Sequence, residues 1–216
     1  MNLLDWFLHL DTHLNDLAGS MGPMLYVVLF AIIFCETGLV VTPFLPGDSL
    51  LFAVGALAST ASSPIHLGWL IPLLIIAAVA GDAVNYACGR FIGPKVFQWE
   101  GSWFFNRKYL DRAQGFYEQY GSKTIVLARF VPIVRTFAPF VAGIGQMQYA
   151  RFWFYNVIGG ITWVVFFLLL GFWCGKFEFV EKNFEVVIFG IVGLSLLPMI
   201  VEWWRSRKTL ADREAV

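Results

Sequence analysis

The sequence contains few charged residues, and neither sign of charge predominates. Asp, Glu, Lys and Arg make up 14% of the 216 residues, compared with about 25% in a typical soluble domain. Fifteen Lys and Arg residues balance fifteen Asp and Glu residues. This composition excludes an ordinary soluble enzyme, a disordered chain and a basic nucleic-acid-binding protein.

Residues suited to disulfides, metal sites and catalysis are also scarce. Cys35, Cys88 and Cys174 stand singly in apolar runs, so neither a disulfide framework nor a cysteine metal site is expected. His9 and His13 are four residues apart, but no third metal ligand follows them. The chain contains no G-x-S-x-G, H-E-x-x-H or P-loop motif. We therefore expect no catalytic residues, no metal and no other cofactor.

Apolar residues are abundant. They make up 58% of the chain, whose mean hydropathy is +0.69. Twenty glycines and nine prolines within such a chain are typical of a helical membrane protein with broken helices. The sequence predicts one all-α membrane domain, 1–216, with about five to seven membrane segments of about 20 residues each.

The first long apolar stretch, 24–58, is interrupted by E-T-G-L-V-V-T-P-F-L-P-G-D-S in its middle. The part before this motif would rise about 18 Å, which passes the middle of a hydrocarbon core about 30 Å thick. We predict a re-entrant helical hairpin with its break at Pro43, Pro46 and Gly47. The alternative is a full span through Val41 followed by a short half-helix.

A second broken stretch, 123–146, contains A-R-F-V-P-I-V-R-T-F-A-P-F-V-A-G. We predict a second re-entrant hairpin, with breaks at Pro132, Pro139 and Gly143. Both stretches contain Pro-Phe followed three residues later by Gly. A weak repeat of broken helices that enter from opposite sides is typical of inverted-repeat transporters, whose binding sites lie near the bilayer midplane.

The remaining segments complete a multi-pass membrane protein. Full spans are predicted at 67–89, 152–174 and 184–204, amphipathic interfacial helices at 3–17 and 106–121, and a charged tail at 205–216. Six Lys and Arg residues lie in 90–123 and four follow residue 204. Because basic flanks favour the cytoplasmic side, we predict a cytoplasmic C-terminus and one hairpin entering from each side.

Four charged side chains fall in the two breaks: Glu36 and Asp48 in the first, Arg129 and Arg135 in the second. An ionised side chain at the bilayer centre costs about 2.5–3.5 kcal/mol unless it is paired or hydrated. We therefore expect the acids and bases to pair across the hairpins and to line a polar cavity. The alternative is that these acid–arginine pairs have only a structural role and hold the two hairpins together.

The two kinds of charge suggest different roles in a transporter. Arginine presents a rigid fork that binds phosphate through two hydrogen bonds, so Arg129 and Arg135 are the candidate ligands for an anionic headgroup. Carboxylates in a low-dielectric site can exchange protons near neutral pH, so Glu36 and Asp48 are the candidates for proton coupling.

Several other polar residues lie in the predicted spans. Asp82 either joins the polar cavity as an accessory residue or forms hydrogen bonds within the bundle. Arg90 is expected to reach the cytoplasmic interface. Asn156 and Thr162 are expected to form interhelical hydrogen bonds. Trp163 is assigned, with the other tryptophans, to interface belts or packing.

Four motifs together resemble the DedA family of bacterial inner-membrane proteins, which belongs to a superfamily with the VTT (SNARE-associated Golgi protein) domain. They are E-T-G-L-V-V-T-P-F-L-P-G-D-S-L-L at 36–51, G-D-A-V-N-Y-A-C-G-R at 81–90, F-Y-E-Q-Y-G at 116–121 and the arginine motif at 128–143. The resemblance implies two opposed re-entrant hairpins. It also implies an essential acidic pair at Glu36 and Asp48, and an essential arginine pair at Arg129 and Arg135.

The resemblance further implies transport of a lipid carrier such as undecaprenyl phosphate, or of a phospholipid such as phosphatidylethanolamine. It also implies a location in the bacterial inner membrane and a role in envelope integrity and proton-motive force. The sequence therefore predicts a lipid flippase or scramblase with membrane lipid and protons as its partners. The alternatives are a proton-coupled exchanger of small cations or drugs and a non-transporting scaffold. An oligomer is compatible with the sequence.

Overall fold

The computed structural model describes residues 20–39, 47–60, 63–96, 121–177 and 190. Within these ranges the regular elements are helices, and no strand occurs among them. In chain order they are α3 (Pro23–Gly38), α4 (Gly47–Leu57), α5 (Leu67–Val96), the 3₁₀ helix η1 (Gly121–Lys123), α7 (Thr124–Ala128), α8 (Pro132–Ile144) and α9 (Tyr149–Cys174). The predicted all-α class is confirmed.

Two helices are long and apolar enough to cross a membrane. These segments are Leu67–Phe91, of 25 residues, and Tyr149–Cys174, of 26 residues, and their mean hydropathies are 2.1 and 2.2. At about 1.5 Å per residue, each exceeds a hydrocarbon core about 30 Å thick. Both coincide with predicted spans. The continuation of α5 to Val96 shows that the glycines near its end do not stop the helix.

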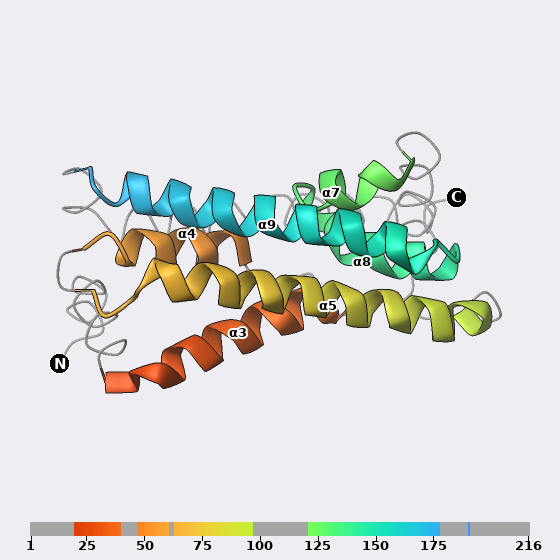
Figure 1. Ribbon diagram of the computed structural model, residues 1–216, viewed down its shortest axis with the longest axis horizontal. Coiled ribbons are helices and arrows are strands. Elements are labelled where there is room, and N and C mark those ends of the chain that lie inside the picture. The colour runs from red at the N-terminus through yellow and green to blue at the C-terminus, as the bar shows by residue number, and fades with distance from the viewer. Residues whose placement is uncertain (1–19, 40–46, 61–62, 97–120, 178–189, 191–216) are drawn as a thin grey trace, which may run out of the picture.

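The short helices lie beside different halves of the two long ones. Figure 1 shows α5 and α9 along the length of the bundle, with α3 and α4 near the end where α5 begins and α7 and α8 near the other end. The end of α3 touches the middle of α5, because a Cβ on Gly38 would lie 3.4 Å from the Cα of Gly81. α3 therefore ends at the mid-level of α5.

The same order of elements occurs twice: a short helix, a second short helix and a long helix. The first short helix of each set contacts the long helix that follows it, giving the pairs α3–α5 and α7–α9. The second short helix contacts the long helix of the other set, giving α4–α9 and α8–α5. Each long helix is thus held by one short helix from each set.

Glycines allow the close α4–α9 and α5–α8 contacts. A Cβ on Gly171 would overlap the carbonyl oxygen of Phe52 in α4, and a Cβ on Gly89 would overlap that of Phe140 in α8. Small residues let membrane helices approach until their backbones touch. The glycines of α9 and α5 therefore hold α4 and α8 at backbone contact distance.

The second break differs from its prediction. The chain leaves helical geometry between Arg129 and Val131, and Pro132 then begins α8. Pro139 and Gly143 lie inside α8, so their assignment to the break was wrong. The physical reason is packing: α8 lies directly on α5, where a Cβ on Gly143 would overlap the carbonyl oxygen of Tyr86. Such tertiary contacts outweigh the local helix-breaking tendency of proline and glycine.

Part of the prediction falls outside the described residues. Pro43 and Pro46 of the first break lie there, and Gly47 is the first residue of α4. The segments 3–17 and 205–216, and nearly all of 106–121 and 184–204, also lie outside.

Candidate functional site: a buried cluster of charged residues

Arg135 joins the two halves of the molecule. It lies in the first turns of α8, and its Nη1 donates a hydrogen bond of 2.6 Å to Oδ1 of Asp48 in α4. Its Nη2 donates to Oε1 of Glu36 in α3. The structure therefore brings both carboxylates of the first broken stretch onto one guanidinium of the second.

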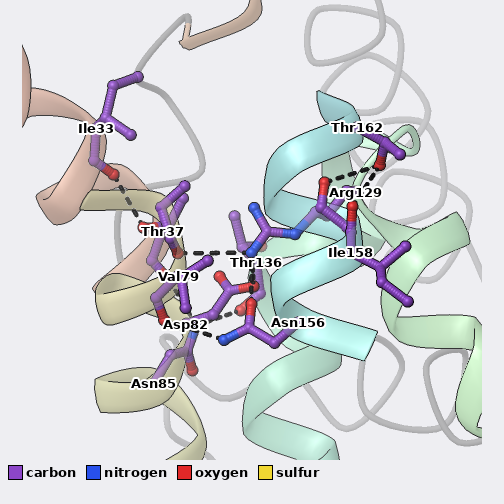
Figure 2. A network of polar contacts seen from close by, with 12 residues as sticks. Ile33, Thr37, Val79, Asp82, Asn85, Arg129, Thr136, Asn156, Ile158 and Thr162 are labelled. Atoms are coloured by element: carbon purple, nitrogen blue, oxygen red, sulfur yellow. Dashed lines mark hydrogen bonds and ion pairs between the residues drawn. The ribbon is translucent and has the colours of Figure 1, made fainter. Parts of the chain in front are cut away.

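Arg129 has a different partner from those expected. Its Nη2 lies 2.5 Å from Oδ2 of Asp82 in α5 and 2.6 Å from Oδ1 of Asn156 in α9. Figure 2 shows Arg129 extended toward these two side chains. The expected pairing of Arg129 with Glu36 or Asp48 was wrong, because Arg129 follows α7 on the α9 side, where α5 supplies the carboxylate at the same level.

The two ion-pair groups differ in exposure. The side chains of Arg129 and Asp82 are each 5% exposed, so this ion pair is buried in the interior of the bundle. In the other group Glu36 is 2% exposed, whereas Arg135 is 13% and Asp48 22% exposed. The more accessible edge of the cluster is therefore formed by Arg135 and Asp48.

Glu36 sits against the beginning of α4. The backbone N–H of Gly47, the first residue of that helix, donates a hydrogen bond of 3.2 Å to its Oε1. The N-terminus of a helix carries a partial positive charge, which favours a carboxylate there. A Cβ at position 47 would overlap this carboxylate, so the contact requires glycine.

Trp163 contacts both groups, which the sequence analysis missed. Its buried indole N–H donates a hydrogen bond of 2.7 Å to Oδ1 of Asp48. The guanidinium carbons of Arg129 and Arg135 lie 6.0 Å and 5.6 Å from its ring centroid. The available signal was its position near the middle of α9, away from the helix ends where interfacial tryptophans gather.

Amide side chains bind the broken helices to the long ones. Nδ2 of Asn85 in α5 donates to the carbonyl of Thr37 at 3.1 Å and to that of Thr136 at 2.9 Å, so it contacts both α3 and α8. Nδ2 of Asn156 donates to the carbonyl of Val79 at 3.0 Å. Broken backbone inside a membrane must find such partners, because lipid offers none. The predicted interhelical role of Asn156 is confirmed.

Two other polar residues behave more locally. Thr162 donates to the carbonyls of Ile158 and Gly159 in its own helix, so the expected interhelical bond is not the one formed. Arg90 is exposed and donates a 3.2 Å hydrogen bond to the hydroxyl of Tyr86 one turn earlier. Among the residues that the structure describes, neither side chain forms a hydrogen bond or an ion pair with the charged cluster.

A small cavity lies between the two ion-pair groups. It is lined by Glu36, Thr37, Asp82, Arg129, Arg135, Thr136 and Trp163 and has a volume of about 10 Å³. That is room for about one water molecule. Within the described ranges, no group of three or more His, Cys, Asp or Glu side chains is placed to hold a metal ion. The described site is therefore a set of buried ion pairs, with Arg135 and Asp48 at its more accessible edge.

Comparisons with known proteins place this cluster in a family context. The family model for the VTT domain matches residues 45–172. The chain is 51% identical to Protein DedA of Escherichia coli (strain K12) over 209 residues, which are 97% of this chain and 95% of that protein. It is 39% identical to Inner membrane protein YqjA of the same strain over 160 residues, 73% of this chain and 70% of that protein.

A mycobacterial protein is also similar to the chain. The chain is 43% identical to the uncharacterized membrane protein MT0380 of Mycobacterium tuberculosis over 183 residues, which are 85% of this chain and 80% of that protein. No solved structure matches the chain.

Proposed function

Because the chain belongs to the DedA family of VTT-domain membrane proteins, we propose that it transports a phosphate-bearing lipid across the bacterial inner membrane. Undecaprenyl phosphate and a phospholipid such as phosphatidylethanolamine are the two candidate substrates. The observation that carries the proposal is the partly exposed guanidinium of Arg135, held between two helix breaks by Glu36 and Asp48.

The helix lengths support two opposed re-entrant hairpins. At about 1.5 Å per residue, the 16 residues of α3 and the 11 of α4 rise only about 24 Å and 16 Å, less than a core about 30 Å thick. The exchanged packing partners of α4 and α8 support an inverted repeat. In this topology the breaks face each other near the midplane and the C-terminus lies in the cytoplasm.

The geometry suggests separate tasks for the two arginines. Arg135 is the direct phosphate ligand, because its guanidinium is a two-pronged donor at the accessible edge of the cluster. Arg129 is enclosed by Asp82 and Asn156, so it supports the site by its charge and by holding α5 and α9 together. The acyl or prenyl tail of the substrate stays in lipid.

The charge balance supports proton coupling. The cluster contains three carboxyl groups, Glu36, Asp48 and Asp82, and two guanidinium groups. A buried cluster with one surplus negative charge is unfavourable, and an arriving phosphate would add to that surplus. Proton uptake by Glu36 or Asp48 would therefore favour phosphate binding and link lipid movement to the proton gradient.

The test is a headgroup-accessibility assay in proteoliposomes. The purified protein is reconstituted with labelled undecaprenyl phosphate and, separately, with labelled phosphatidylethanolamine, with and without a pH gradient. We expect one lipid to move in the wild type and not in Arg135→Ala. Arg90→Ala, which removes an exposed arginine outside the cluster, is the matched control. Full activity of a folded Arg135→Ala protein would refute the assignment.

A conservative replacement separates this function from cation or drug exchange. Lysine keeps the positive charge but cannot bind phosphate as a planar fork. Arg135→Lys is therefore expected to lose lipid transport. If the carboxylates were a site for small cations and Arg135 only balanced their charge, lysine would be tolerated. A scaffold would show no transport of either lipid and would tolerate Glu36→Asp.

A further inference from the structure

We propose that the carboxylate of Glu36 occupies the anion site of this protein, and that a substrate phosphate binds by replacing it. The site consists of the Arg135 guanidinium and the backbone N–H of Gly47 at the start of α4. The inference rests on the proposed function, because the phosphate is taken to be that of the transported lipid. It adds that the protein carries its own competitor for that phosphate.

The contacts of Glu36 are those that a phosphate oxygen would make. Its Oε1 accepts one hydrogen bond from Nη2 of Arg135 and another from the N–H of Gly47. A charged donor and a helix N-terminus together are a typical binding arrangement for phosphate. The glycine at position 47 leaves the helix start open, since any Cβ there would fill the space that the carboxylate now takes.

The second oxygen of Glu36 shows that this carboxylate is held on one side only. Oε2 is buried and has no hydrogen-bond partner in the described structure. A buried carboxylate oxygen without a partner carries a desolvation cost. A tetrahedral phosphate that entered from the edge formed by Arg135 and Asp48 could keep the same two donors and place its other oxygens elsewhere.

The size of the cavity indicates whether a phosphate binds beside the Glu36 carboxylate or takes its place. The space beside Glu36, Arg135 and Trp163 is about 10 Å³, which fits about one water molecule. A phosphate group is larger than one water molecule, so this space does not hold it beside Glu36 in the present conformation. Withdrawal of the carboxylate would free the space and the two donors together.

Asp48 does not share this role, although it contacts the same guanidinium. Its Oδ1 accepts hydrogen bonds from Nη1 of Arg135 and from the indole N–H of Trp163. Trp163 lies in α9, so Asp48 is anchored from a second helix independently of the arginine. Trp163 is thus a positioning residue, which keeps Asp48 in place while Glu36 leaves.

The test measures binding of a soluble probe rather than transport. Inorganic phosphate and a short-chain phosphatidic acid are titrated into the full-length protein in detergent by calorimetry. Removing an occupant that fills the site most of the time raises the apparent affinity by the reciprocal of the free fraction. We expect Glu36→Gln to bind at least one of the two probes about tenfold more tightly than the wild type. Arg135→Gln should bind neither.

Asp48→Asn is the matched control, because it removes the same charge from the same arginine. We expect a smaller gain than for Glu36→Gln, since Asp48 does not cover the start of α4. An equal or larger gain for Asp48→Asn would overturn the proposal. So would unchanged or weaker binding by Glu36→Gln, once its circular dichroism and thermal midpoint match the wild type.

The design separates this inference from the transport function. Tighter binding by Glu36→Gln, together with no movement of either lipid by the wild-type protein in proteoliposomes, would uphold the internal competitor and refute the lipid transporter. Lipid movement that depends on Arg135, with no gain from Glu36→Gln, would uphold transport and refute the competitor. A gain limited to the short-chain lipid identifies a lipid phosphate as the ligand, whereas a gain with inorganic phosphate identifies the phosphate group alone.

Discussion

Arg129 and Asp82 form an ion pair of 2.5 Å between Nη2 and Oδ2, and each side chain is only 5% exposed. The two residues come from different halves of the molecule, since Asp82 lies in α5 and Arg129 follows α7. Asn156 of α9 contacts the same Nη2 at 2.6 Å. This pair therefore joins α5, α7 and α9 in the interior of the bundle.

We predict that Asp82→Ala strongly destabilises the protein. The substitution leaves the Arg129 guanidinium buried without its carboxylate. Removing one partner of a buried ion pair lowers the free energy of unfolding by about 3–5 kcal/mol. The thermal midpoint in detergent and the folded yield should both fall. Asp82→Ala with the stability of the wild type would show that Arg129 has another adequate partner.

A paired replacement provides the control for that prediction. Asp82→Leu combined with Arg129→Met removes both charges, and apolar replacement of a whole buried pair is often neutral or stabilising. The double variant should regain much of the stability that Asp82→Ala loses. If the pair acts only as a lock, the double variant also keeps transport, whereas a field effect of Arg129 on Arg135 predicts a loss of transport.

The second prediction concerns the indole N–H of Trp163. Trp163→Phe keeps an aromatic ring facing both arginines but removes the 2.7 Å hydrogen bond to Asp48. A hydrogen bond to a charged group contributes about 1.5–3 kcal/mol. We expect a lower thermal midpoint and weaker transport. Trp153→Phe, on an exposed tryptophan of the same helix, should change neither.

Trp163→Leu tests the ring separately from its N–H. Leucine also removes the contact of the ring with the two guanidinium groups, which contributes about 0.5–2 kcal/mol. Its thermal midpoint should fall below that of Trp163→Phe. Equal thermal midpoints for Trp163→Phe and Trp163→Leu would mean that the contact between the aromatic ring and the two guanidinium groups does not stabilise the protein.

The third prediction tests the close contact between α5 and α8. A Cβ on Gly89 would overlap the carbonyl oxygen of Phe140, so Gly89→Ala must move the helices apart, at about 1–3 kcal/mol. Gly68 is in the same helix and has open space around it. Gly68→Ala should therefore be neutral or slightly stabilising. Thermal midpoints of the two variants in detergent provide the comparison.

The sequence predicts the residues of the cluster better than their pairing. Glu36, Asp48 and Arg135 stand out because charges inside apolar stretches must find partners. The partner of Arg129 could not be derived, since it depends on how α5 and α9 lie against each other rather than on sequence spacing. Asp82 was identifiable as a charged residue inside a predicted span, but not as the residue that meets Arg129.

Local signals failed where packing decides the outcome. Pro139 and Gly143 are residue types that usually interrupt a helix, yet both lie inside α8 because that helix is held against α5. Tryptophan is a typical interfacial residue, yet Trp163 is 1% exposed and donates a hydrogen bond to Asp48. In both cases a neighbouring helix supplies the contact that determines the role, and no short sequence window contains that neighbour.

The last prediction concerns the direction in which the second hairpin enters the membrane. Lys123 precedes α7 and Gln148 precedes α9, and both are exposed. If α7 and α8 form a re-entrant hairpin, both positions lie on the cytoplasmic side, and the exposed His66 at the start of α5 lies on the opposite side. Single cysteines at these three positions report their side through a membrane-impermeant maleimide.

The background is a protein in which Cys35, Cys88 and Cys174 are replaced by alanine, which is feasible because all three are free thiols. In intact cells His66→Cys should react, whereas Lys123→Cys and Gln148→Cys should react only after the membrane is permeabilised. If α7 and α8 together crossed the membrane, Lys123→Cys and Gln148→Cys would react from opposite sides. That result would contradict the topology of two opposed hairpins. Arg135 and Glu36 would then no longer belong to hairpins that enter the membrane from opposite sides.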